Sequence, residues 1–103
     1  MQNELKIDKK CEDGICTITL RGQLTTTTAP KLGAVLEEGY DGFAELIFEI
    51  ADLEYLTSAG LRVLLLARQQ TEDLNIPMKL RNVSEEIMQV FTATGFADIL
   101  TIE

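Results

Sequence analysis

The segment AELIFEIADLEYLTSAGLRVLLLARQQTED, residues 44–73, carries the strongest structural signal in the sequence. Its first seven residues, 44–50, place apolar side chains on both alternating faces, which is typical of a central strand in an at least partly parallel sheet. Residues 51–57 then predict a loop. From residue 58 or 59 onward apolar side chains recur at helical spacing with few polar interruptions, so we expect a helix that is largely buried or partly covered by a partner.

Two strands are predicted upstream of this segment, over residues 5–11 and 15–21. They are joined at Asp13-Gly14, a dipeptide typical of a two-residue hairpin turn. Residues 22–28 then predict a polar connector that leads into a short helix. Its threonines offer an amino-terminal cap for that helix, because a hydroxyl oxygen can accept a hydrogen bond from a free backbone N–H group.

The downstream residues predict a short strand over 77–81, a helix that begins near Ser84 and ends at Gly95, and a last edge strand over 99–102. The order of elements is therefore ββαβαβαβ. Strands that alternate with helices in this way predict the α/β class. We expect a single domain over residues 1–103, with an open mixed sheet of about five strands and helices packed on it.

The composition excludes several classes of function. The chain has 103 residues with 17 acidic against nine basic side chains, a net charge of −8, which argues against binding to duplex nucleic acid or to an anionic membrane surface. The longest unbroken aliphatic run, residues 63–67, falls far short of the roughly 20 apolar residues of a membrane span. The first ten residues lack the apolar core of a signal peptide, so we expect a cytoplasmic protein.

The sequence contains no histidine and only two cysteines, Cys11 and Cys16. Histidine-based catalysis and histidine metal sites are therefore unavailable, and the cysteines are too few for a zinc site. We expect no enzyme activity, no metal and no cofactor. The predicted hairpin places the two cysteines opposite each other, where a disulfide is geometrically conceivable. A reducing cytoplasm instead favours two small buried thiols.

One serine sits where an α/β sheet often places function, at the end of a strand and the start of a helix. Ser58 is followed by Ala59 and Gly60, whose small side chains allow another backbone to approach. A phosphate on Ser58 would be held by free helical N–H groups and the helix dipole. The alternative is a plain capping serine, worth about 1 kcal/mol, which the residues alone favour. A nucleophilic role is disfavoured, because Asp52 and Glu54 are the only candidate bases nearby.

Three segments of the chain resemble a known family. DLEYLTSAGLRVLLLARQ, CTITLRGQLTTTTAPKL and MKLRNVSEEIMQVFTATGFADILTIE are similar to the central motif, the second strand with its Gly-x-Leu connector, and the final strand and helix of the STAS domain family. The resemblance is to its bacterial branch of anti-sigma factor antagonists, also called anti-anti-sigma factors. It extends over nearly the whole chain and implies a STAS-like fold.

The resemblance implies a partner-switching regulator of transcription, monomeric when free. Such an antagonist binds an anti-sigma factor that is also a serine kinase, and thereby releases a sigma factor. The kinase phosphorylates a serine, which breaks the complex, and a metal-dependent, PP2C-type phosphatase restores the active form. By motif position Ser58 matches that phosphoacceptor. The partner-binding surface expected around it comprises Gly22, Leu24, Thr25, Thr26, Tyr55, Leu56, Thr57, Ala59, Gly60, Leu61 and Arg62.

Two positions depart from the family pattern. Thr57 and Thr25 stand where the family often has aspartate, so two negative charges are missing near the expected phosphoacceptor. This change bears on the choice of kinase and on the need for phosphorylation. An alternative function is a STAS module that senses a small ligand or nucleotide, or one that docks on a lipid-transport ABC system. Fold alone does not separate these functions.

Overall fold

A computed structural model describes residues 4–103, so the first three residues of the predicted domain lie outside the described residues. Four strands form one sheet in the order β1-β2-β3-β4. They comprise β1 (Leu5–Glu12), β2 (Ile15–Leu24), β3 (Glu45–Leu56) and β4 (Met78–Arg81). The β1–β2 pair is antiparallel, whereas β3 runs parallel to both β2 and β4. The predicted α/β class with a mixed sheet is confirmed.

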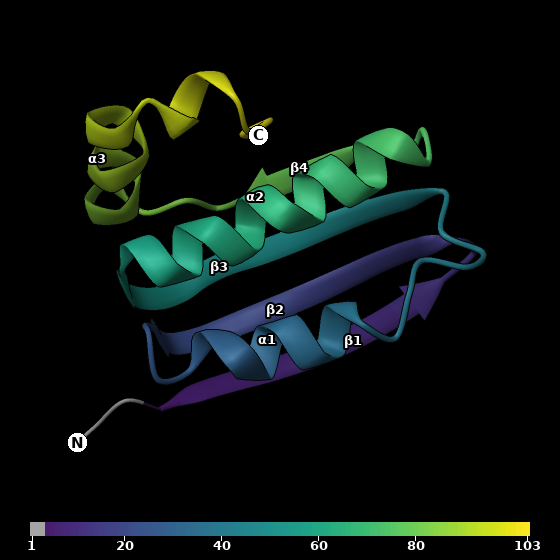
Figure 1. Cartoon of the computed structure of the whole chain (residues 1–103), viewed down its shortest axis with the longest axis horizontal. Helices are drawn as coiled ribbons and strands as arrows, with labels where there is room; N and C mark the ends of the chain where they lie inside the picture. The colour runs from purple at the N-terminus through teal and green to yellow at the C-terminus, as the bar shows by residue number, and fades with distance from the viewer. Residues whose placement is uncertain (1–3) are drawn as a thin grey trace.

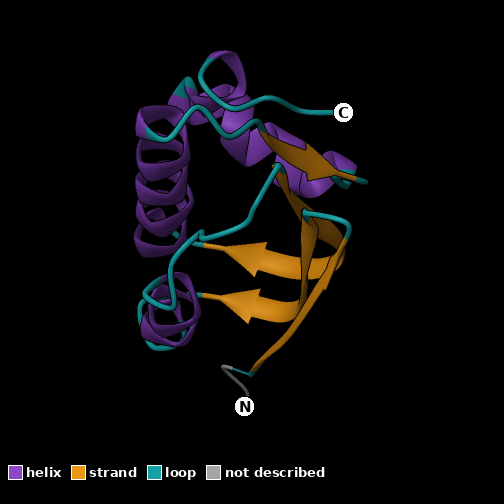
Figure 2. Ribbon diagram, turned by 90° about the vertical axis from the view of Figure 1, so that its right-hand side faces the viewer, coloured by secondary structure: helices purple, strands orange, loops and turns teal. Residues whose placement is uncertain are grey.

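The helices are α1 (Ala29–Leu36), α2 (Ser58–Asp73) and α3 (Glu85–Thr94), followed by a short 3-10 helix, η1 (Phe96–Asp98). Figure 1 shows α1 and α2 side by side over the sheet, and Figure 2 shows that they cover the same face of it. Within residues 4–103 no helix combines the length and the apolar character that crossing a bilayer requires.

The central strand β3 is buried on both faces, as its sequence predicts. Leu46, Phe48 and Ile50 point into the core and are fully buried, and Ile47 on the opposite face is 4% exposed. Burying one such aliphatic or aromatic side chain contributes about 1.5–3 kcal/mol. The core between sheet and helices therefore holds β3 firmly, and with it the start of α2, which follows β3 after one residue.

Two strands extend further than predicted. Residues 51–56, expected in a loop, continue β3, and residues 22–24, expected in a connector, continue β2. The two extensions pair with each other, with Leu24 opposite Leu56. The pairing carries register shifts around Gly22, and such bulges blur the strict alternation that identifies a strand in a sequence. Strand pairing, which the sequence does not display, therefore lengthens both elements.

The predicted fifth strand over residues 99–102 is reduced to one isolated bridge between Leu80 and Ile102. The Leu80 N–H group donates to the carbonyl oxygen of Thr101 at 2.9 Å, and Glu103 N–H donates to the Leu80 carbonyl at 2.8 Å. Residues 96–98 form the helix η1, which occupies the chain just before the bridge. Too few residues remain in line with β4 for a ladder to form.

The hairpin register is as predicted, but the expected pair of buried thiols is wrong. Cys11 lies opposite Cys16, with Cα atoms 4.0 Å apart, and the two side chains form a disulfide. Cys16 is buried, whereas Cys11 is exposed. Directly opposed residues of an antiparallel pair bring their Cβ atoms close enough for this bond. The strand register places the two cysteines opposite each other, and the structure joins them. The expectation of free thiols, which rested on a reducing cytoplasm, is therefore not met.

Candidate functional site

The carboxyl ends of β2 and β3 meet at one edge of the sheet, because the two strands are parallel. At that edge the backbone N–H group of Thr57 donates to the carbonyl oxygen of Leu24 at 3.0 Å. Helix α2 begins one residue later, at Ser58. The predicted proximity of the Gly22–Leu24 segment to the start of this helix is therefore present in the structure.

The helix N-cap residue is Thr57 and not Ser58. Thr57 is extended and its side chain makes no capping hydrogen bond. Among the described residues, its Oγ1 atom is a buried oxygen without a hydrogen-bond partner. Ser58 occupies the first helical position and is exposed, and its hydroxyl makes no hydrogen bond within residues 4–103. The plain capping role considered for Ser58 is therefore wrong.

Gly60 permits the close approach of the two elements. A Cβ atom at this position would lie 2.7 Å from Leu24 Cγ, 2.8 Å from Leu56 Cδ1 and 2.9 Å from the Leu24 carbonyl oxygen. Such separations are well inside van der Waals contact, so any larger residue would push α2 away from the strands. Gly60 thus determines how closely α2 packs against the end of β2.

Gly22 determines how β2 bends beside the site. Its φ angle is +102°, and a Cβ atom there would lie 2.4 Å from the Glu4 carbonyl oxygen. The next residue, Gln23, donates its N–H group to that same oxygen at 2.8 Å. Glycine adopts this backbone conformation without steric cost, which allows β2 to bend at the bulge and still pair with the start of β1.

The four threonines after β2 form a tight turn. Thr28 Oγ1 accepts a hydrogen bond from Thr25 N–H at 2.8 Å and donates to the Gln23 carbonyl at 2.7 Å. Thr25 and Thr28 are buried at 7% and 1% exposure, whereas Thr26 is exposed. The turn is therefore held by side-chain hydrogen bonds, which stabilise the loop beside Ser58.

Ser58 and the partner-binding surface expected around it divide into two layers. The outer layer is exposed or half-buried and comprises Gly22, Thr26, Tyr55, Thr57, Ser58, Ala59 and Arg62. The inner layer is buried and comprises Leu24, Thr25, Leu56, Gly60 and Leu61. The inner side chains pack in the core because they line the junction of β2, β3 and α2, so their expected placement on the surface is corrected. They support the outer layer from beneath.

The surroundings of the site are acidic. Glu54 is exposed on β3, and Asp52 is exposed and pairs with Arg21 Nε at 3.6 Å. The ion pair lies beside an open hollow lined by Arg21, Gly22, residues 51–54, Ser84 and Glu86. The sequence-based prediction missed Arg21, because only the β2–β3 register places it opposite Asp52.

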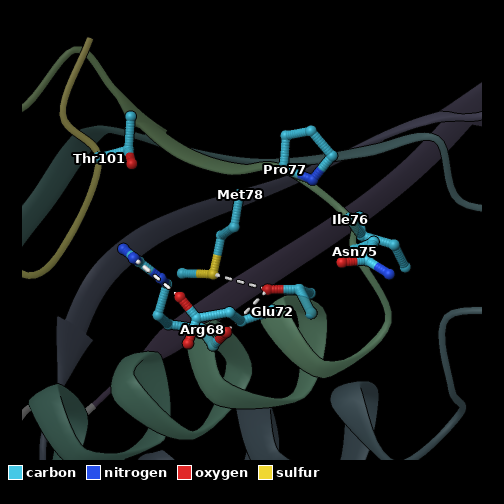
Figure 3. Close-up of a pocket in the computed structure, with 8 residues that line it drawn as sticks. Arg68, Glu72, Asn75, Ile76, Pro77, Met78 and Thr101 are labelled. Atoms are coloured by element: carbon cyan, nitrogen blue, oxygen red, sulfur yellow. Dashed lines mark hydrogen bonds and ion pairs between the residues drawn. The ribbon is translucent and has the colours of Figure 1, made fainter.

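A second hollow lies at the carboxyl end of α2, at the opposite end of the helix from Ser58 (Figure 3). Three of its polar side chains, Arg68, Glu72 and Thr71, are engaged in contacts within the chain. The Arg68 guanidinium donates to the Ile99 carbonyl and pairs with Glu72 at 3.3 Å, and Thr71 Oγ1 donates to the Ala67 carbonyl at 2.9 Å. The contact between Arg68 and Ile99 attaches the carboxyl-terminal segment to α2, which is a structural role. No group of three or more metal-ligating side chains occurs within residues 4–103.

The geometry and the sequence together define the class of protein. The STAS domain model matches residues 6–103, so the chain belongs to the STAS domain family. Among the curated relatives, BtrV of Bordetella bronchiseptica, named as an anti-sigma factor antagonist, is 30% identical over 91 residues, which cover 87% of this chain and 78% of BtrV. The anti-sigma-B factor antagonist of Bacillus subtilis is 26% identical over 98 residues, covering 95% and 90%.

The fold is also similar to that of solved structures. The anti-sigma factor antagonist SpoIIAA in its unphosphorylated form is 17% identical, with a TM-score of 0.74 over 97% of this chain and 87% of that one. The Bacillus SpoIIAA in the phosphorylated form has a TM-score of 0.64, over 97% and 91%. The family and the STAS-like architecture predicted from the sequence are thus confirmed. The absence of enzyme activity and the role of each site residue remain predictions.

Proposed function

We propose that this chain is an anti-sigma factor antagonist, which binds an anti-sigma factor that is also a serine kinase and so releases a sigma factor. The observation that supports it best is the state of Ser58. Its hydroxyl is exposed and unbonded within residues 4–103, at the first position of a 16-residue helix, beside the end of β2. Relatives that cover most of this chain carry the name of antagonist.

The outer layer of the site offers a docking surface of mixed chemistry. Tyr55 is 57% exposed and stands three residues before Ser58, with Arg62 four residues after it. Tyrosine and arginine are the residues that most often carry binding energy at protein interfaces, because they combine large contact areas with polar ends. The buried inner layer keeps this surface rigid, so little ordering free energy is lost on binding.

The proposed switch is a phosphoryl transfer. The Ser58 oxygen attacks the γ-phosphorus of ATP bound to the kinase, a new P–O bond forms, ADP leaves, and the hydroxyl proton passes to a base of the kinase. A PP2C-type phosphatase reverses the modification by hydrolysis, in which water attacks phosphorus and the serine oxygen leaves. The backbone N–H groups of the first turn of α2 lack helical partners and can donate hydrogen bonds to the dianion without a change of fold.

Phosphorylation releases the partner because it adds negative charge to the docking surface. The phosphate adds about −1.5 to −2 charges to a surface that already carries the exposed carboxylates of Asp52 and Glu54. Taking this charge out of water under a partner costs several kcal/mol. Since each 1.4 kcal/mol corresponds to about tenfold in affinity, we expect the dissociation constant to rise at least about a hundredfold.

The test uses two variants of Ser58 and a matched control. We expect Ser58→Asp to bind the kinase at least about a hundredfold more weakly, and Ser58→Ala to bind as the wild type and to resist release by ATP. Thr101→Asp adds the same charge at an exposed residue of the carboxyl-terminal segment, beside the far end of α2, and should leave binding unchanged. Calorimetric titration measures the affinities, and circular dichroism verifies the fold of each variant.

Mass spectrometry after incubation with the kinase and ATP locates the phosphate. We expect it on Ser58 and not on Thr57, because the Oγ1 atom of Thr57 is buried. Equal binding of wild type and Ser58→Asp would overturn the proposed switch. A phosphate on Thr57 would overturn the assignment of the phosphoacceptor.

A further inference from the structure

Arg62 lies one helical turn after Ser58 on the exposed side of α2. Residues four apart on a helix are neighbours, with Cβ atoms about 5–6 Å apart. Long side chains in helices point back toward the amino terminus, so an arginine covers the turn before its own position. We therefore expect the side chain of Arg62 to cover the turn that begins with Ser58.

Arg62 has no anionic partner in the part of the chain that the structure describes. The ion pairs there use five other cations, Lys9, Arg21, Arg68, Lys79 and Arg81. Within residues 4–103, Lys6, Lys10 and Lys31 share the unpaired state of Arg62, but none of them stands on the helix that begins with Ser58. The first turn of α2 contains no acidic residue that would offset this charge. A cation near the positive end of a helix dipole is unfavourable by some tenths of a kcal/mol. An arginine at this place therefore lacks a counter-charge in the unmodified chain.

A phosphate on Ser58 supplies that counter-charge. Building on the function proposed above, we propose that Arg62 is a positioning residue that binds the phosphate of phosphorylated Ser58 within the same chain. The guanidinium fork matches phosphate oxygens in a bidentate manner, which a lysine does not reproduce. The phosphate then lies between Arg62 and the free N–H groups of the first turn.

The surrounding charges favour this pairing over the alternatives. The other charged groups near this end of the sheet include Asp52, Glu54 and Glu4, which repel a phosphate. They also include Arg21 of β2, which is already paired with Asp52, and Lys6 of β1, which lines a hollow with Glu54. Lys31 of α1 also lies at this end, because α1 and α2 both start there (Figure 1). Unlike Lys31, Arg62 stands on the same helix as the phosphate, one turn away.

The test installs phosphoserine at position 58 during translation, so that no kinase is needed. Phosphorus NMR then follows the second ionisation of the phosphate as the pH changes. Arg62 favours the dianion, so we expect Arg62→Gln to raise the phosphate pKa by about half a unit and Arg62→Lys to raise it less. Lys31→Gln removes the same charge from the neighbouring helix and should move this pKa by about 0.1 unit at most.

A second measurement needs no variant. In the proton–nitrogen spectrum of the wild type, the Nε–H signal of Arg62 should move downfield and exchange more slowly with water once Ser58 carries phosphate. Equal effects of Arg62→Gln and Lys31→Gln on the phosphate pKa, or an unchanged Arg62 signal, would overturn this inference. A phosphorylated chain that still binds the kinase tightly would overturn the proposed function, and leaves the pairing measured here intact.

Discussion

At the scale of single residues, Thr57 and Ser58 are neighbouring hydroxyl residues in opposite situations. The Oγ1 atom of Thr57 is buried without a partner among the described residues, whereas the Ser58 side chain is exposed. The difference arises because Thr57 is still extended and Ser58 is already helical, so successive side chains leave the chain in different directions. A modifying enzyme can reach only the second hydroxyl.

Gly60 offers a test of the packing that positions Ser58. Gly60→Ala should destabilise the protein by about 2 kcal/mol, because its Cβ atom would lie within 2.9 Å of three atoms of Leu24 and Leu56. For a domain of this size we expect the melting temperature to fall by roughly 10 °C. Thermal denaturation followed by circular dichroism measures it.

Gly33 is the matched control. It lies within α1, and a Cβ atom there would meet nothing within 4 Å. Gly33→Ala should therefore stabilise the protein by up to about 1 kcal/mol, through helix propensity and a lower entropy of the unfolded chain. If both substitutions stabilised the protein, the close approach of α2 to the end of β2 would be refuted.

At the scale of elements, the β1–β2 hairpin carries a covalent link between its strands. The Cys11–Cys16 disulfide closes a short loop around the turn at Asp13 and Gly14. By the entropy of loop closure, a link with this sequence separation stabilises the fold by about 2 kcal/mol. We expect a chemical reductant to lower the melting temperature by several degrees, as measured by calorimetry with and without it.

Cys11→Ala provides the comparison for the disulfide. The exposed position of Cys11 makes this substitution mild for packing, while it removes the link. The variant should melt at one temperature whether or not a reductant is present. Finding two alkylatable thiols in wild-type protein that has been equilibrated in an oxidising glutathione buffer would contradict the disulfide.

At the scale of the whole molecule, a network of charges joins the end of the chain to the sheet. Arg81 Nε and Glu103 Oε1 are 2.8 Å apart, and Lys79 pairs with Glu45 at 3.0 Å. The hydrogen bond and the charge of Arg81, with a smaller effect of Lys79, hold the pKa of the Glu103 carboxyl below its ordinary value. The network attaches the last residues to β4 across the isolated bridge.

This lowered pKa predicts how stability depends on pH. The unfolded chain binds a proton on Glu103 at a higher pH than the folded chain does, so the stabilisation is present above the unfolded pKa, about 4.3. It is lost as the pH falls through the lower pKa of the folded state. Glu103→Gln should therefore be less stable than the wild type at pH 7, with a difference that disappears in acid. Urea denaturation at a series of pH values measures it.

An exposed carboxylate without an ion pair serves as control for Glu103. Glu12→Gln removes the same charge from β1, where the described residues provide no ion-pair partner. This variant should differ less from the wild type at pH 7 than Glu103→Gln does. A Glu103→Gln variant whose stability matches the wild type at every pH would show that the network contributes nothing.

Local patterns predicted most of the elements correctly. Asp13-Gly14 is the hairpin turn, with positive φ angles at both residues as a type I′ turn requires. Ser84 caps α3 by accepting a hydrogen bond from Ile87 N–H at 3.2 Å, and Gly95 ends the helix in the left-handed conformation. These features depend on residues within one turn of each other, so they can be read in the sequence.

The errors share another cause. The extension of β3 through residues 51–56 and the pairing of Arg21 with Asp52 both depend on which strands lie side by side. Both features join residues of β2 and β3 that are far apart along the chain, and a bulge at Gly22 shifts the register of these strands. The position of Ser58 at the start of a helix was predictable from spacing, whereas the division of its surroundings into exposed and buried layers was not.

The sequence by itself determined the strands and helices, their order, the family and the place of Ser58 at a helix start, because periodicity, turns and caps act over a few residues. Tertiary structure decided that Cys11 and Cys16 form a disulfide and that Leu24 packs against Gly60. It also decided that Ser58 is exposed whereas the Oγ1 atom of Thr57 is buried. These outcomes depend on contacts between segments distant in the chain, and the packing of one segment against another settles them.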